Sequence, residues 1–239
     1  MDCADYALLA EAAYDTKRVR APLEAAGWVR DWQKVDRRSG FACALYRHEA
    51  GGERVLAFRG TRPDTWGALV ADIAIGLRRL TPQFTLALAA YGEAAIEVGG
   101  EEAIVGVCGH SLGGALAQYV GVHYDKLVYA FNAPGIGGID GITAETAAGD
   151  IRNINASGDV VGRYGKRLGR TVALPVPSLR PLPVRAQGPA AVAGGWLVLT
   201  AYLVAQHSIT GLRKHLQRLP AHLRPFAGGV EVAPQEAGG

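Results

Sequence analysis

A short apolar segment, a sharp glycine-rich turn and a second apolar segment follow one another in AIVGVCGHSLGGALAQYV, residues 103–120. The turn has the pattern G-x-S-x-G, with Ser111 between Gly109 and Gly113. A nucleophilic serine can occupy such a strand-to-helix turn, where strain exposes the hydroxyl and neighbouring elements approach too closely for side chains. The segment therefore predicts a strand, a catalytic corner at Ser111 and a helix.

Strands and helices are expected to alternate along the rest of the chain. Short strands are expected between residues 27 and 60, with turns at residues 38–40 and 50–52. Further strands are expected in KLVYAFNAPG, DIRNINASGD and RTVALPV, and helices over residues 64–80 and 82–98. This alternation predicts an α/β fold with a mostly parallel sheet covered by helices on both faces.

Length and composition favour one globular domain. The chain has 239 residues, of which 49% are hydrophobic, and neither an internal repeat nor a dividing linker interrupts it. We expect a single domain over residues 1–228 and a loose tail over residues 229–239. The three cysteines lie far apart without C-x-x-C spacing, and this absence of a pattern is typical of free thiols in a reducing compartment. Cys108 is expected to be a buried apolar residue.

The N-terminal segment MDCADYALLAEAAYDTK is expected to form an amphipathic helix. Its acidic residues precede its apolar ones, whereas a secretory signal has a basic start before an apolar core. We therefore expect the protein to be cytoplasmic, or to leave the cell by a route without a cleaved signal peptide.

Charge is unevenly distributed along the chain. Residues 1–151 carry a net charge of −5 and residues 152–239 one of +8. This asymmetry indicates either an anionic partner surface, such as a membrane, or a basic face that is merely solvated. A nucleic-acid partner is not expected, because the basic residues lack interleaved aromatics and no binding motif accompanies them.

A serine hydroxyl needs a base and an acid to become a nucleophile, and this type of site has the chain order Ser, acid, His. Among the downstream aspartates, Asp125 ends the expected helix and Asp150 opens a strand at its wrong end. Asp140 and Asp159 both lie in loops. Asp159 is the better candidate, because it directly follows the strand in IRNINASGD.

Four histidines follow Ser111 in the sequence: His123, His207, His215 and His222. His123 lies on the expected nucleophile helix, and the last two fall within or after a later helix. His207 lies in a short polar stretch just before that helix and is the favoured base. His110 is expected to pack or to support its neighbours. No acidic or histidine cluster has the spacing of metal ligands, and neither a metal nor a cofactor is expected.

Several motifs, distributed over residues 5–213, resemble the class 3 (fungal-type) lipases of the α/β-hydrolase superfamily. They are LLAEAAYD, VLAFRGT, TW with Asp72 six residues after the Trp, GHSLGGALA, FNAPGIG, NINASGDVVG and HSITGL. The resemblance implies an α/β-hydrolase fold with Ser111 as nucleophile, Asp159 as acid and His207 as base. It also implies an oxyanion hole formed by Thr61 and the backbone N–H of Leu112.

The implied activity is hydrolysis of a lipid ester through an acyl-enzyme, as in a lipase, a monoacylglycerol lipase or a phospholipase A. Two alternatives stay open: an esterase or thioesterase acting on a soluble ester, and a hydrolase fold that only binds. The expected partner is a lipid or ester substrate. If the protein is exported as a secretion-system effector, an immunity or chaperone protein is a further expected partner.

Two segments have alternative interpretations. Residues 66–84 correspond to the lid of the lipases that the chain resembles, or form an ordinary packed helix. Residues 189–205 form an uncharged run of 17 residues, shorter than a membrane span. This run is either a buried core element or an apolar flap beside the acyl pocket, with Trp196 or Tyr202 partly exposed and the basic residues of 163–185 facing anionic head groups.

Overall fold

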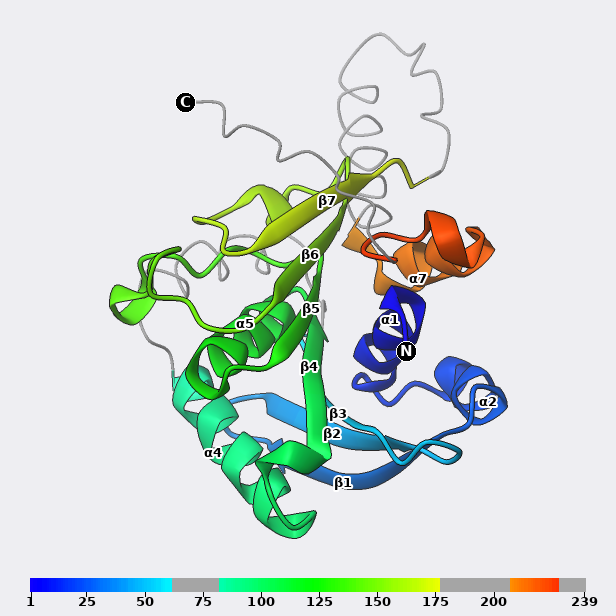
Figure 1. Ribbon diagram of the computed structural model, residues 1–239, viewed down its shortest axis with the longest axis horizontal. Helices are drawn as coiled ribbons and strands as arrows, with labels where there is room; N and C mark the ends of the chain where they lie inside the picture. Colours follow the sequence, from blue (N-terminus) through cyan, green and yellow to red (C-terminus); the bar gives the residue numbers. More distant parts are fainter. Residues whose placement is uncertain (62–81, 177–206, 228–239) are drawn as a thin grey trace, which may run out of the picture.

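The computed structural model describes residues 1–61, 82–176 and 207–227, and its centre is a seven-stranded sheet (Figure 1). The strands lie side by side in the order of the sequence. They are β1 (Trp28–Asp36), β2 (Phe41–His48), β3 (Arg54–Phe58), β4 (Ile104–His110), β5 (Leu127–Phe131), β6 (Ile151–Ala156) and β7 (Arg170–Leu174).

The sheet combines an antiparallel edge with a parallel centre. Strands β1, β2 and β3 pair antiparallel, whereas each neighbouring pair from β3 to β7 is parallel. The tight turns of the antiparallel part lie where the sequence predicts them, and Gly40 and Gly52 adopt positive φ of 72° and 74° there. Parallel neighbours require long crossovers, and helices over residues 82–97 and 112–124 lie in the connections from β3 to β4 and from β4 to β5.

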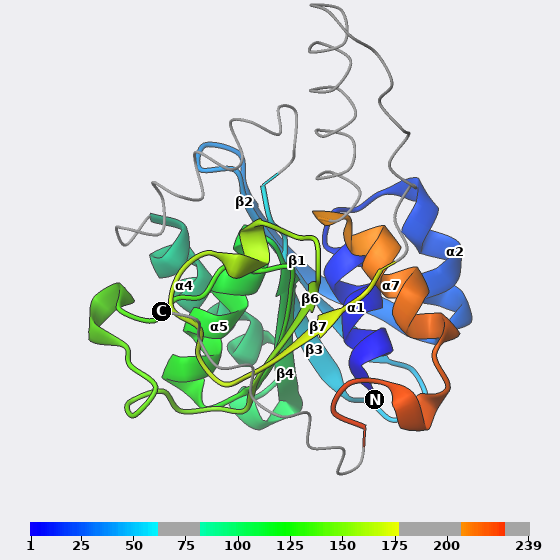
Figure 2. The same cartoon turned by 90° about the horizontal axis from the view of Figure 1, so that it is seen from above.

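Helices cover both faces of the sheet (Figure 2). One face packs against α4 (Pro82–Glu97) and α5 (Leu112–Tyr124), and the other against α1 (Cys3–Ala12), α2 (Lys17–Ala25) and α7 (Ile209–Arg218). Short 3-10 helices are η1 (Glu101–Ala103), η2 (Ile139–Gly141), η3 (Val161–Arg163) and η4 (Ala221–Leu223). The α/β fold expected from the sequence, a mostly parallel sheet with helices on both faces, is confirmed.

The first two helices differ from the sequence prediction. Helix α1 is buried on nearly every side rather than on one stripe, because it contacts the sheet as well as α2 and α7; only Asp5 of its residues is not buried. Helix α2 was not predicted, and Val19 is its one buried residue. The segment is short and charged and contains Pro22, so its sequence gives a weak helix signal.

Several sequence predictions lie outside the described residues. These are the helix over residues 64–80, most of the lid segment 66–84, the apolar run 189–205 with Trp196 and Tyr202, and the tail 229–239. The last residues of the lid segment belong to α4, whose predicted start at Pro82 is confirmed. Within the described ranges, no helix has the length and apolar character needed to cross a membrane.

Candidate active site

Ser111 occupies a strained corner between β4 and α5. Its φ of 58° and ψ of −131° are rare for a residue with a side chain. The corner is held by backbone hydrogen bonds: the Ser111 N–H donates to the Phe131 carbonyl at 3.0 Å, and its own carbonyl accepts from Gly114 N at 2.9 Å. The predicted nucleophile elbow is therefore present in the structure.

The flanking glycines are required by close backbone approach. A Cβ atom on Gly109 would lie 2.2 Å from the Gly113 carbonyl oxygen. A Cβ atom on Gly113 would lie 2.2 Å from the carbonyl oxygen of Phe58, at the end of β3. The first turn of α5 therefore packs directly on the end of β3, where the segment Arg59-Gly60-Thr61 begins.

The segment after β3 lies beside the serine. A Cβ atom on Gly60 would lie 3.2 Å from the Cβ atom of Ser111, and Thr61 is the next residue. Leu112 is the first residue of α5, so its N–H has no acceptor within the helix. The segment after β3 and the first turn of α5 thus meet at Ser111, as an oxyanion hole formed by Thr61 and Leu112 requires.

His207 and Asp159 form a buried pair. The Nδ1 atom of His207 lies 2.8 Å from Oδ1 of Asp159, and both side chains are almost fully inaccessible to solvent. The other carboxylate oxygen of Asp159 accepts a hydrogen bond from Gly162 N at 2.6 Å. Because a carboxylate oxygen accepts hydrogen bonds, Nδ1 of His207 is the donor in this pair, and Nε2 is the ring nitrogen that does not contact the acid.

The serine does not join this pair by a hydrogen bond. Ser111 is 1% exposed, and its Oγ atom has no hydrogen-bond partner among the described residues. The bond between a catalytic serine and its base is often long in a free enzyme and tightens only when substrate binds. The structure therefore brings the acid and the base together and leaves the serine contact unmade.

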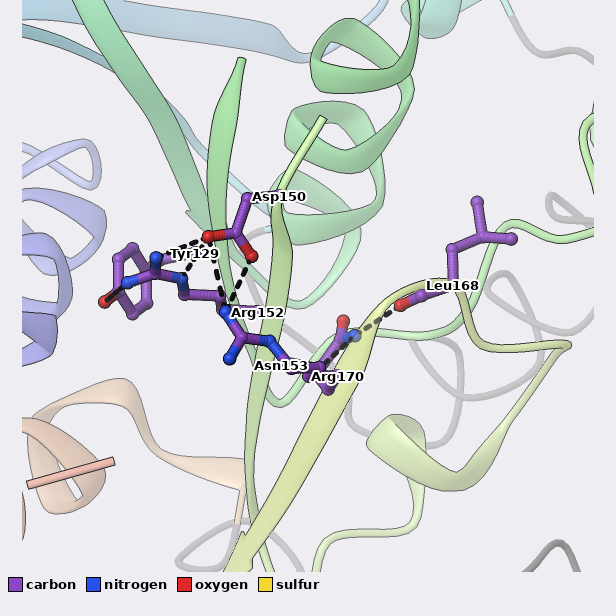
Figure 3. A network of polar contacts seen from close by, with 6 residues as sticks. All are labelled: Tyr129, Asp150, Arg152, Asn153, Leu168 and Arg170. Atoms are coloured by element: carbon purple, nitrogen blue, oxygen red, sulfur yellow. Dashed lines mark hydrogen bonds and ion pairs between the residues drawn. The ribbon is translucent and has the colours of Figure 1, made fainter. Parts of the chain in front are cut away.

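The rejected acids have other partners. Asp140 is exposed and accepts a hydrogen bond from Tyr119 on α5 at 3.0 Å. Asp150 precedes β6 and is bonded by Arg152 and Arg170, in a network at the amino ends of the strands (Figure 3). Ligand sites in parallel sheets lie at the opposite, carboxyl ends, where Asp159 follows β6.

The rejected histidines lie where the sequence predicts them. His123 is on α5, with its Nδ1 atom 2.8 Å from the carbonyl oxygen of Tyr119. His215 is on α7 and His222 is on η4, which follows it. Only His207 is paired with the favoured acid.

A network that the sequence did not reveal links Tyr14 to the base. His110 contacts the Tyr14 hydroxyl through Nδ1 at 2.9 Å and the backbone carbonyl of His207 through Nε2 at 2.6 Å. Burial, with the nearby His207, lowers the pKa of His110 well below its usual value. The neutral ring therefore donates from Nε2 to the carbonyl and accepts from the tyrosine at Nδ1.

The same hydroxyl reaches the segment after β3. The backbone of Gly60 hydrogen-bonds Tyr14, whose pKa is raised by burial, so the phenol stays protonated. Tyr14 and His110 thus connect the segment after β3 to the backbone of His207. The sequence signal was the tyrosine of LLAEAAYD, but its contacts depend on how α1 packs.

The cysteines and possible metal ligands form no second site. All three cysteines are free and buried, and burial raises the pKa of Cys3 and Cys43 to about 12 and that of Cys108 further. In the three described ranges, no group of three or more His, Cys, Asp or Glu residues has the arrangement of a metal site. The geometry offers acid–base and nucleophilic chemistry at Ser111, His207 and Asp159.

Comparison with known proteins identifies a family for most of the chain. The model of the Tle-like phospholipase domain, in the phospholipase-like group, matches residues 5–162. A search of curated proteins finds no match.

Several solved structures of fungal lipases resemble the chain. Lipase II from Rhizopus niveus has a TM-score of 0.49 at 16% identity, over 67% of this chain and 72% of that one. A triacylglycerol lipase from Penicillium expansum has a TM-score of 0.49 at 18% identity, over 70% and 76%. Nonglycosylated Lip2 lipase from Yarrowia lipolytica has a TM-score of 0.49 at 22% identity, over 66% and 72%.

Proposed function

Since the chain belongs to the family of Tle-like phospholipase domains and is a hydrolase of lipid carboxylic esters, we propose that it removes an acyl chain from a glycerophospholipid. Ser111 is the nucleophile, His207 the general base and Asp159 its partner. The observation that carries this assignment is the buried 2.8 Å hydrogen bond between His207 and Asp159, in a chain whose serine occupies a strained corner.

Acylation starts at the serine. The Ser111 Oγ atom attacks the ester carbonyl carbon while Nε2 of His207 takes its proton, and Asp159 stabilises the resulting imidazolium. Negative charge develops on the carbonyl oxygen, where the N–H groups of Thr61 and Leu112 donate to it. Each such donor contributes about 3 kcal/mol of transition-state stabilisation.

The tetrahedral intermediate collapses to an acyl-enzyme, which water then hydrolyses. The imidazolium of His207 protonates the alcohol oxygen as its bond to the carbonyl carbon breaks. The alcohol leaves as a lysophospholipid, and the acyl group stays bonded to Ser111. His207 next takes a proton from water, which attacks the acyl-enzyme and releases the fatty acid. The serine recovers its proton from His207 in this second collapse.

A lipid panel tests the substrate class. Purified protein is incubated with mixed micelles that contain phosphatidylcholine, phosphatidylglycerol, diacylglycerol and monoacylglycerol, and the products are identified by mass spectrometry. We expect lysophospholipid and free fatty acid in equal amounts, and none with Ser111→Ala. Cleavage of glycerides alone would contradict the phospholipase proposal.

The same panel separates the alternatives. An esterase or thioesterase would leave every lipid intact but cleave a short p-nitrophenyl ester or an acyl thioester in a way that depends on Ser111. A fold that only binds would cleave nothing. The buried acid–base pair favours catalysis over binding, because a binding fold has no need of an oriented base.

A further inference from the structure

A cavity of about 440 Å³ lies over the antiparallel edge of the sheet, on the face that carries α1. Strands β1 and β2 form its floor. Ala13 and Asp15, just beyond the end of α1, line one side, and Arg59 lines another. These residues flank Tyr14 and Gly60, so the cavity adjoins residues 59–61, the segment after β3 in which we expect an oxyanion donor at Thr61. We call residues 59–61 the oxyanion segment.

The cavity is lined mainly by cationic and small side chains. Its charged residues are Arg30, Arg37, Arg59 and Asp15, which leave two net positive charges. Asp15 is engaged by Arg30 at 3.3 Å. Arg59 donates from Nη2 to the Gly40 carbonyl at 2.8 Å, which fixes its guanidinium at the cavity wall. Ala42 and Ala44 on the floor leave room for a ligand.

Arg37 is the guanidinium with spare donors. Among the residues that the structure describes, it has neither an ion pair nor a hydrogen bond. A guanidinium presents a planar fork of donors that matches phosphate oxygens in pairs. An arginine without a partner at a cavity of net positive charge is suited to an oxyanion of this shape.

We propose that this cavity holds the phosphodiester head group of the phospholipid whose acyl ester lies at Ser111, an inference that rests on the proposed function. Arg59 precedes Thr61 by two residues, which separates their backbones by at most about 7 Å. The glycerol unit that joins the ester to the phosphate spans a comparable length. The ester can therefore reach the oxyanion segment while the phosphate lies against Arg37 and Arg59.

The test compares a lipid that carries a phosphate with one that lacks it. Dioleoylphosphatidylcholine and dioleoylglycerol are assayed at equal mole fraction in the same nonionic detergent micelles. Phosphatidylcholine has no net charge, so general attraction to an anionic surface does not contribute. The measured quantity is the ratio of kcat/KM for phosphatidylcholine to that for dioleoylglycerol.

The variants are Arg37→Gln and, independently, Arg59→Gln, each of which removes one guanidinium that lies against the phosphate. We expect Arg37→Gln to lower the ratio by about tenfold or more, because a charge-assisted hydrogen bond to phosphate is lost. The matched control is Arg38→Gln, an exposed neighbour outside the cavity, and it should leave the ratio unchanged. Melting temperatures show which variants are folded. An unchanged ratio in both cavity variants, or an equal fall in Arg38→Gln, would overturn the proposal.

A soluble assay makes the head-group site testable apart from the phospholipase activity. Hydrolysis of p-nitrophenyl butyrate is measured with added glycerophosphocholine or inorganic phosphate. We expect competitive inhibition by glycerophosphocholine, with an inhibition constant about tenfold higher in Arg37→Gln. Absence of inhibition would refute the head-group site even if phospholipids are cleaved. Inhibition by inorganic phosphate alone would indicate a free-phosphate site and would also refute it.

Discussion

The chemistry at Ser111 depends on side chains that act as one unit. We expect Ser111→Ala and His207→Ala each to lower ester turnover by about four to six orders of magnitude, and the double variant to lose scarcely more. Asp159→Ala should cost less, because it leaves a misoriented base. The turnover of a p-nitrophenyl ester is measured for the three single variants and the double variant.

His215→Ala provides the matched control for the base, since His215 lies on the adjacent helix α7. It should keep the turnover of the unmodified protein. Loss of activity in this variant together with full activity in His207→Ala would refute the assignment of the base.

The oxyanion assignment of Thr61 separates into a backbone part and a hydroxyl part. Thr61→Val keeps the N–H and the side-chain shape but removes the hydroxyl. We expect kcat to fall about ten- to a hundredfold, because the hydroxyl is a third and weaker donor beside the N–H groups of Thr61 and Leu112. An unchanged kcat would restrict the contribution of Thr61 to its backbone.

The buried His110 makes stability depend on pH. Its pKa is held well below the usual value of a histidine by burial, so the unfolded chain binds a proton there that the folded chain does not. Stability is therefore full above about pH 6.5 and falls as the pH is lowered, by at most about 1.4 kcal/mol per pH unit. His110→Gln cannot titrate, so its melting temperature should fall less between pH 7 and pH 5. An equal slope in both proteins would contradict this.

At the scale of elements, a buried ion pair joins the first and last described α-helices. Arg213 on α7 bonds Glu11 on α1, and Thr210 donates to the same carboxylate at 2.6 Å. Both charged side chains are almost fully buried. Because α7 begins two residues after His207, this pair also holds the helix that directly follows the base.

Removing one charge of this pair should lower the free energy of unfolding more than removing both charges. Glu11→Gln leaves the Arg213 guanidinium buried without a charge partner, and we expect a loss of about 3–5 kcal/mol. The double variant Glu11→Gln/Arg213→Met removes both charges and should recover part of that loss. Urea denaturation of the two single variants and the double variant measures the coupling. Additive losses would show that the ion pair is not coupled.

The sequence predicts elements best where the pattern is local. The strand, corner and helix around Ser111 follow from glycine spacing and apolar runs, and the β1–β2 and β2–β3 turns follow from their glycines. The all-round burial of α1 does not follow, because it depends on which elements pack on both of its sides. The contacts of Tyr14 are equally non-local, since Tyr14 and His110 are separated by 96 positions.

At the scale of the molecule, the parallel sheet gathers residues from distant parts of the sequence at one edge. Ser111 follows β4, Asp159 follows β6 and His207 precedes α7. Chain order and strand ends favour Asp159 over the other aspartates, and Asp159 is the one that contacts His207. The distance between acid and base was not readable from sequence, because it depends on the loop after β6 and on the packing of α7.

The loop between β6 and β7 adds a charge pattern to this edge. Asp159 lies near the start of this loop, and the exposed cations Arg163, Lys166 and Arg167 follow it. The loop belongs to the basic part of the sequence, residues 152–239. A basic segment beside a lipid-cleaving site is suited to approach an anionic membrane surface.

We therefore expect co-sedimentation with vesicles of phosphatidylglycerol that weakens with salt, since surface attraction is screened within about 8 Å at physiological ionic strength. Each cation near an anionic surface contributes about 1 kcal/mol, or about fivefold in affinity. Lys166→Gln/Arg163→Gln should thus bind about 25-fold more weakly. Lys17→Gln/Arg18→Gln removes the same charge from the exposed part of α2, away from this loop, and should bind almost as well as the unmodified protein. Equal weakening in both pairs would mean that net charge alone attracts the protein, and the loop would then have no special contact with the membrane.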